Sequence, residues 1–217
     1  MESVGAALGV DLTRRRWPIV GCMVRPVPGQ PLPDAGMLLV ATPALREPTF
    51  CESVVLLLEV GPHGALGVVL NRPSPVPVGE VLPAWSDLVS CPDVLFRGGP
   101  VGTDEALGVG LRAARPGSDV VWEGFDPIDG DLGLVDLDGP SSQAARGLDR
   151  VRVFAGYAGW DRDQLDDEVA EGSWYVLPGR ATDAFEPHPE ALRRAVLRRQ
   201  PGEVAWLSTR PLDPARN

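Results

Sequence analysis

The stretch RVRVFAGYAGWDRDQLDDEVAEGSWYVLP, residues 150–178, decides how this chain is expected to fold. Its first apolar residues fall at alternate positions, as in a half-buried strand: Val151, Val153 and Ala155. Residues 156–159, Gly-Tyr-Ala-Gly, then predict a turn that leads the chain around Trp160. The first half of the stretch therefore predicts a strand that ends in a glycine turn.

The second half of the stretch has the pattern of a helix followed by a strand. Asp161 is the expected N-cap of the helix, and Gly172 favours the left-handed conformation that ends one. Leu165 and Val169 are four residues apart, so they share one helix face. Residues 173–177, Ser-Trp-Tyr-Val-Leu, predict the next strand.

These residues also resemble the YqgE/AlgH family. Residues 156–176 resemble its Gly-aromatic-Ala-Gly-Trp turn, its Gln-Leu-x-x-Glu helix and its Trp-containing strand. Three further stretches match in the expected order: residues 36–51, 64–73 and 96–101. The resemblance implies an α+β fold in which a curved, mostly antiparallel, bifurcated sheet forms a small barrel surrounded by helices. It implies no particular chemistry, because the family name reflects only an association with an alginate-gene regulator.

The pattern of the other segments favours the same fold class independently. Short apolar runs predict strands at 37–42, 54–60, 65–70, 94–96, 106–111, 120–123, 132–137 and 204–207. Helical patterns occupy 78–82, 141–148 and 189–199. The turn Gly61–Gly64 predicts an antiparallel hairpin between the second and third strands. Many short strands with few helices indicate an α+β fold.

The chain divides into an N-terminal arm and one domain. Residues 1–35 contain five prolines, at 18, 26, 28, 31 and 33, which favour an extended and flexible backbone. Residues 36–217 carry the strand and helix patterns and predict a single domain. No run approaches the roughly 20 apolar residues of a membrane-spanning helix.

Charge and cysteine content narrow the classes of function. The net charge of −10 argues against a general nucleic-acid binder, which needs clustered basic residues. The three cysteines, Cys22, Cys51 and Cys91, form no C-x-x-C pair, so neither a zinc site nor a disulfide framework is expected. The sequence predicts a cytoplasmic protein with reduced thiols and no cofactor or metal, and it leaves the oligomeric state open.

The first candidate site consists of two strand ends that carry arginine. Arg97, Gly98, Gly99 and Pro100 could bind an anion through backbone N–H groups and a guanidinium fork. Asn71 and Arg72 would join them if the fold brings the two ends together. The competing interpretation is structural: the glycines relieve steric strain where a strand ends, and Asn71 binds local backbone.

The second candidate site surrounds the predicted helix. Gln164 and Glu168 share one helix face, and Trp160 and Trp174 could form the walls of a groove beside them. The competing interpretation places both tryptophans in the core, with Gln164 capping the helix. A basic cluster at 193–194 and 198–199 is interpreted as a solvent-exposed helix face.

These patterns favour a non-catalytic module that binds a small anionic ligand or a protein partner in regulation. One alternative is an enzyme of unrecognised, hydrolytic type that uses Glu168 with carboxylates from distant loops. The other is a sequence-specific DNA-binding regulator, although no helix-turn-helix pattern is present.

Overall fold

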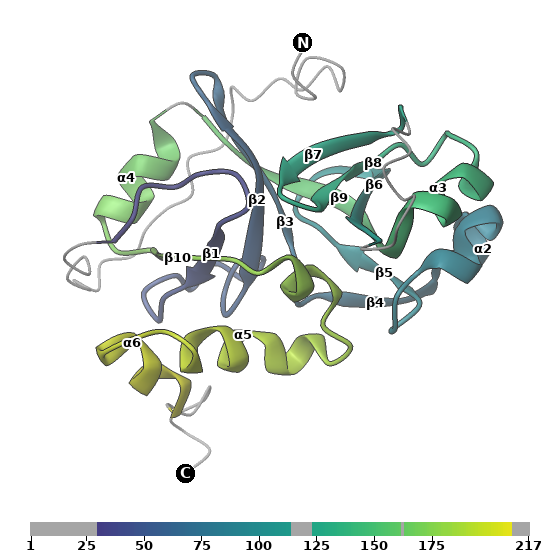
Figure 1. Ribbon diagram of the computed structural model, residues 1–217. Coiled ribbons are helices and arrows are strands. Elements are labelled where there is room, and N and C mark those ends of the chain that lie inside the picture. Colours follow the sequence, from purple (N-terminus) through teal and green to yellow (C-terminus); the bar gives the residue numbers. More distant parts are fainter. Residues whose placement is uncertain (1–29, 114–122, 162, 210–217) are drawn as a thin grey trace.

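The computed structural model describes residues 30–113, 123–161 and 163–209 (Figure 1). Its strands are β1 Leu38–Ala41, β2 Val54–Gly61, β3 Gly64–Val69, β4 Pro73–Pro77, β5 Val94–Arg97, β6 Val101–Arg112, β7 Phe125–Asp129, β8 Leu132–Val135, β9 Leu148–Trp160 and β10 Trp174–Leu177. They form one sheet in the order β10-β1-β2-β3-β9-β6-β8-β7, and β5 pairs with both β4 and β9. The predicted arm lies mostly outside the described residues.

The predicted α+β class and the mostly antiparallel sheet are confirmed. Between described strands, β5 and β9 form a parallel pair and the other pairings are antiparallel. The sheet branches at β9, which pairs with β6 along one edge and with β3 and β5 along the other. The path of paired strands ends at β10 on one side and at β7 on the other, and these two strands do not pair with each other. The sheet is therefore not closed into the barrel that the resemblance implied.

The glycine turn expected at 156–159 is wrong, because β9 runs unbroken from Leu148 to Trp160. Gly156 has φ of +68°, a conformation that glycine adopts without steric cost. The register between β9 and β6 slips at this point, with Val101 opposite Tyr157 and Ala106 opposite Ala155. The extra residues, 102–105, lie in β6, so Gly156 stands opposite an irregularity inside the paired strands rather than at a turn out of β9.

Two other segments differ from the sequence pattern. The strand expected at 204–207 is a short helix, α6 Glu203–Trp206, followed by η3 Leu207–Thr209. The strand β4 contains prolines 73, 75 and 77, which conceal it in the sequence. Proline is tolerated there because β4 is an edge strand whose outer N–H groups need no ladder partner. The predicted hairpin of β2 and β3 is confirmed, and the strand expected at 120–123 lies almost wholly outside the described residues.

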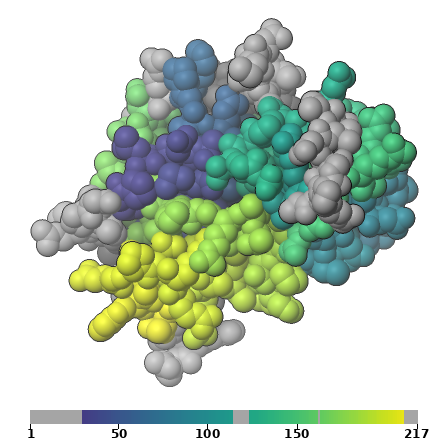
Figure 2. All heavy atoms as spheres, in the orientation of Figure 1, coloured from purple at the N-terminus to yellow at the C-terminus, as the bar shows by residue number. Residues whose placement is uncertain are grey.

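The remaining helices cover both faces of the sheet. They are α2 Val78–Val81, η1 Pro83–Leu88, α3 Ser141–Gly147, α4 Gln164–Ala170, η2 Ala181–Phe185 and α5 Pro189–Arg198. Alternate residues of β1 enter different clusters: Leu38 and Val40 pack with α5, whereas Leu39 and Ala41 pack with α4. The C-terminal helices α5 and α6 form the lower surface in Figures 1 and 2. Within the described residues, no helix is long and apolar enough to cross a membrane.

Arg152 on β9 is an arginine at the centre of the core, only 1% exposed. Its Nη1 and Nη2 donate to the carbonyls of Glu186 (3.2 Å) and Cys91 (2.6 Å), and its guanidinium lies 4.2 Å from the centre of the Phe96 ring. Burial lowers the pKa of Arg152 to about 10, against opposing effects of Glu186 and Cys91. The buried charge joins two loops that are distant in sequence.

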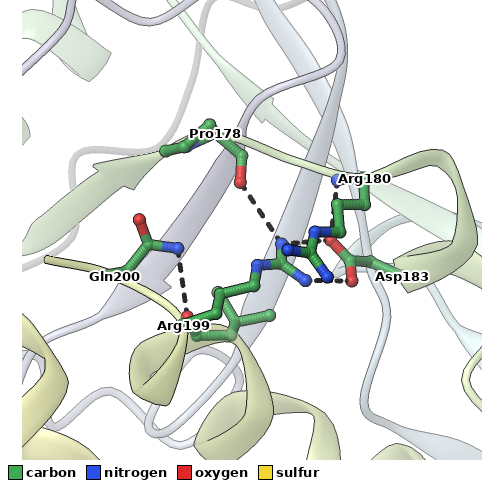
Figure 3. Close-up of polar contacts among 6 residues, drawn as sticks. Pro178, Arg180, Asp183, Arg199 and Gln200 are labelled. Carbon is green, nitrogen blue, oxygen red and sulfur yellow. Dashed lines mark hydrogen bonds and ion pairs between the residues drawn. The ribbon is translucent and has the colours of Figure 1, made fainter.

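An ion pair fixes the end of α5 against the loop after β10 (Figure 3). Arg199 donates to both carboxylate oxygens of Asp183, through Nη1 at 2.6 Å and through Nη2, and Nη2 also donates to the Pro178 carbonyl at 3.3 Å. Asp183 accepts a further bond from the Arg180 N–H, at 2.8 Å, which closes the first turn of η2. The pair is largely buried, because the side chains of Arg199 and Asp183 are only 17% and 8% exposed.

We predict that Asp183→Asn lowers the free energy of unfolding by about 3 kcal/mol, because it leaves a largely buried guanidinium without its counterion. Urea unfolding followed by tryptophan fluorescence measures the change. Glu190→Gln is the matched control, since its exposed carboxylate lies on the same helix 3.8 Å from His188, and little change is expected. Equal losses in the two variants would show that the ion pair does not fix α5.

Candidate functional site

The two arginine-containing strand ends lie side by side. β4 and β5 pair with Pro73 opposite Phe96. One residue further along, the Arg97 N–H donates to the Arg72 carbonyl at 2.8 Å. The fold therefore brings together the two strand ends of the first candidate site, as that site requires.

The glycines of this site lie against the backbone of β9. The Gly98 N–H donates to the Ala155 carbonyl at 2.9 Å, and the Gly98 carbonyl accepts from the Val69 N–H at 2.8 Å. A Cβ on Gly98 would lie 2.1 Å from the carbonyl oxygen of Gly156, and one on Gly99 would lie 2.1 Å from that of Tyr157. The Gly98 amide is therefore used within the sheet, and both glycines permit a backbone approach that no side chain allows.

The polar side chains at the end of β3 bind the turn between β1 and β2. The Asn71 carboxamide accepts from the Val54 N–H and donates to the Glu52 carbonyl, both at 3.0 Å. Arg72 donates through Nη2 to the Cys51 carbonyl. These contacts match the structural interpretation of Asn71, and they also orient the Arg72 guanidinium toward this turn.

Arg97 and Pro100 differ in their surroundings. The Arg97 side chain is exposed and forms no ion pair with a described residue, so its guanidinium is available to solvent. Pro100 is part-buried between Gly99 and the first residue of β6. Among the residues of the first candidate site, Arg97 therefore has guanidinium N–H groups that are available to bind an anion.

The second candidate site is a compact hydrogen-bonded cluster. One carboxylate oxygen of Glu168 accepts from the indole N–H groups of Trp160 (3.0 Å) and Trp174 (2.8 Å). The other oxygen accepts from the Gln164 side-chain amide at 2.8 Å. The two indoles are 2% and 1% exposed and meet edge to face, with ring centres 6.0 Å apart. These contacts match the core interpretation of the tryptophans, and Glu168 supplies the polar partner that their N–H groups need.

Gln164 also fixes the start of α4. Its side-chain oxygen accepts from the Asp161 N–H at 3.3 Å, the bond that a capping box would contain if Asp161 were the N-cap. The helix starts at Gln164, with Asp163 at the N-cap and no side-chain cap bond. The expected cap at Asp161 therefore lies too early in the chain, although its pairing with Gln164 is present.

One turn contacts both candidate sites, and the sequence analysis did not identify it. Phe50 packs on the indoles of Trp160 and Trp174, with ring centres 6.1 and 5.7 Å apart. The next two residues, Cys51 and Glu52, present the carbonyls that Arg72 and Asn71 bind. We call residues 50–53 the β1–β2 turn.

Arg193 on α5 is bonded to Ala41, whose N–H donates to the Ser53 carbonyl of the β1–β2 turn at 3.0 Å. The Arg193 Nη2 donates to the Ala41 carbonyl at 3.0 Å, whereas its Nε is buried without a hydrogen-bond partner. Burial lowers the pKa of Arg193, and Glu52, Tyr175 and Cys51 act in the opposite direction. The solvent-exposed interpretation of the basic cluster holds for Arg194 and Arg198 but not for Arg193 and Arg199, which are part-buried. In the sequence, only the position of Arg193 next to the apolar Leu192 could have indicated this.

The chain belongs to the AlgH-like family, whose family model matches residues 38–205. A UPF0301 protein from Streptomyces avermitilis is 50% identical over 182 residues, which cover 84% of this chain and 94% of the relative. A UPF0301 protein from Thermobifida fusca is 47% identical over 190 residues, with the same coverage. These bacterial relatives confirm the resemblance that the sequence motifs predicted.

Two solved structures are similar to this fold. The crystal structure of a protein from Corynebacterium diphtheriae has a TM-score of 0.78 and 31% identity, and the match covers 83% of this chain and 94% of that one. The solution structure of the AlgH protein from Pseudomonas aeruginosa has a TM-score of 0.61 and 26% identity, covering 84% and 97%. The fold is therefore shared across most of each chain.

We predict that Gly98→Ala lowers the free energy of unfolding by about 3 kcal/mol or more, because the new methyl group would overlap the Gly156 carbonyl. Urea unfolding measures the loss. Gly61→Ala is the matched control: no atom lies within 4 Å of its added Cβ, and little change is expected. A stable Gly98→Ala protein would contradict the packing role and restore the anion-binding interpretation of this glycine.

We predict that Glu168→Gln lowers the free energy of unfolding by about 2 kcal/mol, because a carboxamide has one acceptor oxygen: if that oxygen stays with the indoles, its NH2 group faces the Gln164 amide donor. This corresponds to a fall in Tm of about 4 to 8 °C. Glu171→Gln, exposed just after the same helix, is the control and should leave Tm nearly unchanged. An unchanged Tm for Glu168→Gln would show that the hydrogen bonds of Glu168 do not stabilise the fold.

Proposed function

We propose that this chain is a non-catalytic binding module of the bacterial cytoplasm that binds a small anionic ligand or a protein partner in regulation. The observation that carries the proposal is the hydrogen bond from the Arg97 N–H to the Arg72 carbonyl, which brings two guanidinium-bearing strand ends together. Neither arginine forms an ion pair with a carboxylate of the described residues. Such arginines suit an oxyanion or an acidic partner surface.

The chemistry of the neighbouring side chains supports binding over catalysis. Both carboxylate oxygens of Glu168, the residue on which an enzyme would depend, accept hydrogen bonds from core side chains. His63 and His188 are both exposed, and His188 lies 3.8 Å from the carboxylate of Glu190. In the described part of the chain, no three His, Cys, Asp or Glu side chains gather as metal ligands would.

The proposed cytoplasmic location and the proposed regulatory role rest on other observations. Cys51 and Cys91 are free thiols, a state that the reducing cytoplasm maintains. The relatives are named as UPF0301 proteins without an activity. The regulatory role follows only from the association carried by the family name, and the net charge of −10 favours a ligand or protein over nucleic acid as partner.

We predict that Arg97→Gln reduces the rise in Tm that phosphate, nucleotides or sugar acids cause in the unaltered chain, because it removes an exposed guanidinium from the site. Thermal unfolding with each compound measures the rise. Arg146→Gln, which removes an exposed positive charge from α3, is the control and should retain the full effect.

The proposal fails if none of these anions changes the Tm of the unaltered chain and Arg97→Gln also leaves the set of co-purifying proteins unchanged. A salt-dependent gel shift with duplex DNA would favour the alternative of a DNA-binding regulator.

A further inference from the structure

We propose that Arg193 and the β1–β2 turn form a binding site for one small oxyanion, a carboxylate or a phosphate group, with Arg72 beside it. The inference rests on the proposed function and places the principal contacts of that anion at the turn, with Arg97 as a further contact of the same module. It is argued from the unpaired donors of Arg193, the charges around the turn and the conformation of Glu52.

The Arg193 guanidinium has more N–H donors than it has hydrogen-bond acceptors among the described residues. A guanidinium has five N–H groups, and one hydrogen bond, from Nη2 to the Ala41 carbonyl, is formed within the described residues. Its Nε is buried and has no partner, and no carboxylate of the described chain lies within ion-pairing distance. Buried donors in folded proteins are almost always paired, so the Nε of Arg193, like that of Arg152, needs an acceptor other than the described residues, either a water or an anion. An oxyanion supplies two adjacent oxygens to such a fork.

A second guanidinium lies at the same turn. Arg72 donates to two carbonyls, those of Cys51 and Asn71, so its hydrogen bonds leave its charge without a counterion. Arg72 is bonded to the Cys51 carbonyl, and Arg193 is bonded to Ala41, whose N–H donates to the Ser53 carbonyl of the same turn at 3.0 Å. A bound anion would offset the charge of two cations that pair with no carboxylate of the described residues.

The backbone of the turn is held in an uncommon conformation. Glu52 has φ of +59°, in the left-handed region that residues other than glycine seldom adopt. Asn71 fixes this conformation, because its amide donates to the Glu52 carbonyl while its oxygen accepts from the Val54 N–H. Backbone strain that is maintained in this way is concentrated at binding sites.

Glu52 has a defined role in this arrangement. Its carboxylate is near enough to influence Arg193 but does not form an ion pair with it. It would compete with an incoming anion, so its removal should strengthen anion binding. The ligand must be small, because the Arg193 side chain is only partly exposed and its Nε is buried.

The test measures Tm of the full chain in about 50 mM sodium phosphate, sodium acetate or sodium chloride at equal ionic strength. For a Kd of about 10 mM, phosphate or acetate should raise Tm by about 3 °C relative to chloride. The larger of the two shifts identifies a tetrahedral or a planar oxyanion. Arg193→Gln should abolish the shift, and Glu52→Gln should enlarge it.

Arg194→Gln is the matched control, because it removes the same charge from the neighbouring, exposed position of α5. Each shift is taken relative to the same variant in chloride, so a general loss of stability in Arg193→Gln does not count as loss of binding. A shift that persists in Arg193→Gln, or is lost equally in Arg194→Gln, overturns the inference. As a second readout on the unaltered chain, the ¹⁵N resonance of the Arg193 Nε should move with the anion while that of Arg194 does not, and an unmoved Arg193 signal also overturns it.

The same measurements separate this inference from the proposed function. If Arg97→Gln abolishes the shift and Arg193→Gln keeps it, the module binds its anion at Arg97 and the inference alone fails. If Arg193→Gln abolishes the shift and Arg97→Gln keeps it, the inference stands and the anchor moves to the turn. If neither anion shifts Tm of the unaltered chain, the inference fails together with the anion-binding part of the proposed function.

Discussion

The close contact between Gly98-Gly99 and β9 is the constraint on which the rest of this structure depends. β9 is the strand at which the sheet branches, and β5 can pair with it only because Gly98 and Gly99 lack side chains. The same contact places the Gly98 carbonyl where it accepts from Val69, so β3 and β5 meet along one edge of β9. Without this approach, the strand ends that carry Arg72 and Arg97 would not meet.

The β1–β2 turn connects the core to the polar surface. Phe50 belongs to the aromatic cluster of Trp160 and Trp174, while Cys51 and Glu52 bind the side chains at the end of β3. A displacement of the turn would therefore affect both the core and any anion bound beside it. The turn is therefore held from both sides, by the aromatic cluster and by the side chains at the end of β3.

Much of the fold could be predicted from local pattern, and the errors have identifiable causes. The apolar runs of β1, β2 and β3 and the start of α5 at Pro189 were found because periodicity and caps are local signals. β4 was missed because its prolines normally exclude a strand, and only its place at the sheet edge makes them acceptable. The turn at 156–159 was misplaced because glycine signals a turn and a strand irregularity equally well.

The candidate sites were predicted in part. The indoles and Glu168 were grouped correctly because they lie within one short stretch, but the contact of Phe50 with them comes from a residue far away in the chain. Arg193 was grouped with solvent-exposed arginines, since helical spacing gives the face of a residue but not what covers that face.

By itself, the sequence determined the α+β class, the family and the segments that carry arginine and glycine, because these depend on local pattern and residue identity. Only the tertiary structure decided that the sheet stays open and that the Gly98 N–H is hydrogen-bonded to β9. It also decided that Arg193 lies next to the β1–β2 turn with its Nε unpaired. Those features depend on which distant backbones approach one another. That approach is set by packing across the whole sheet, which no local stretch of sequence encodes.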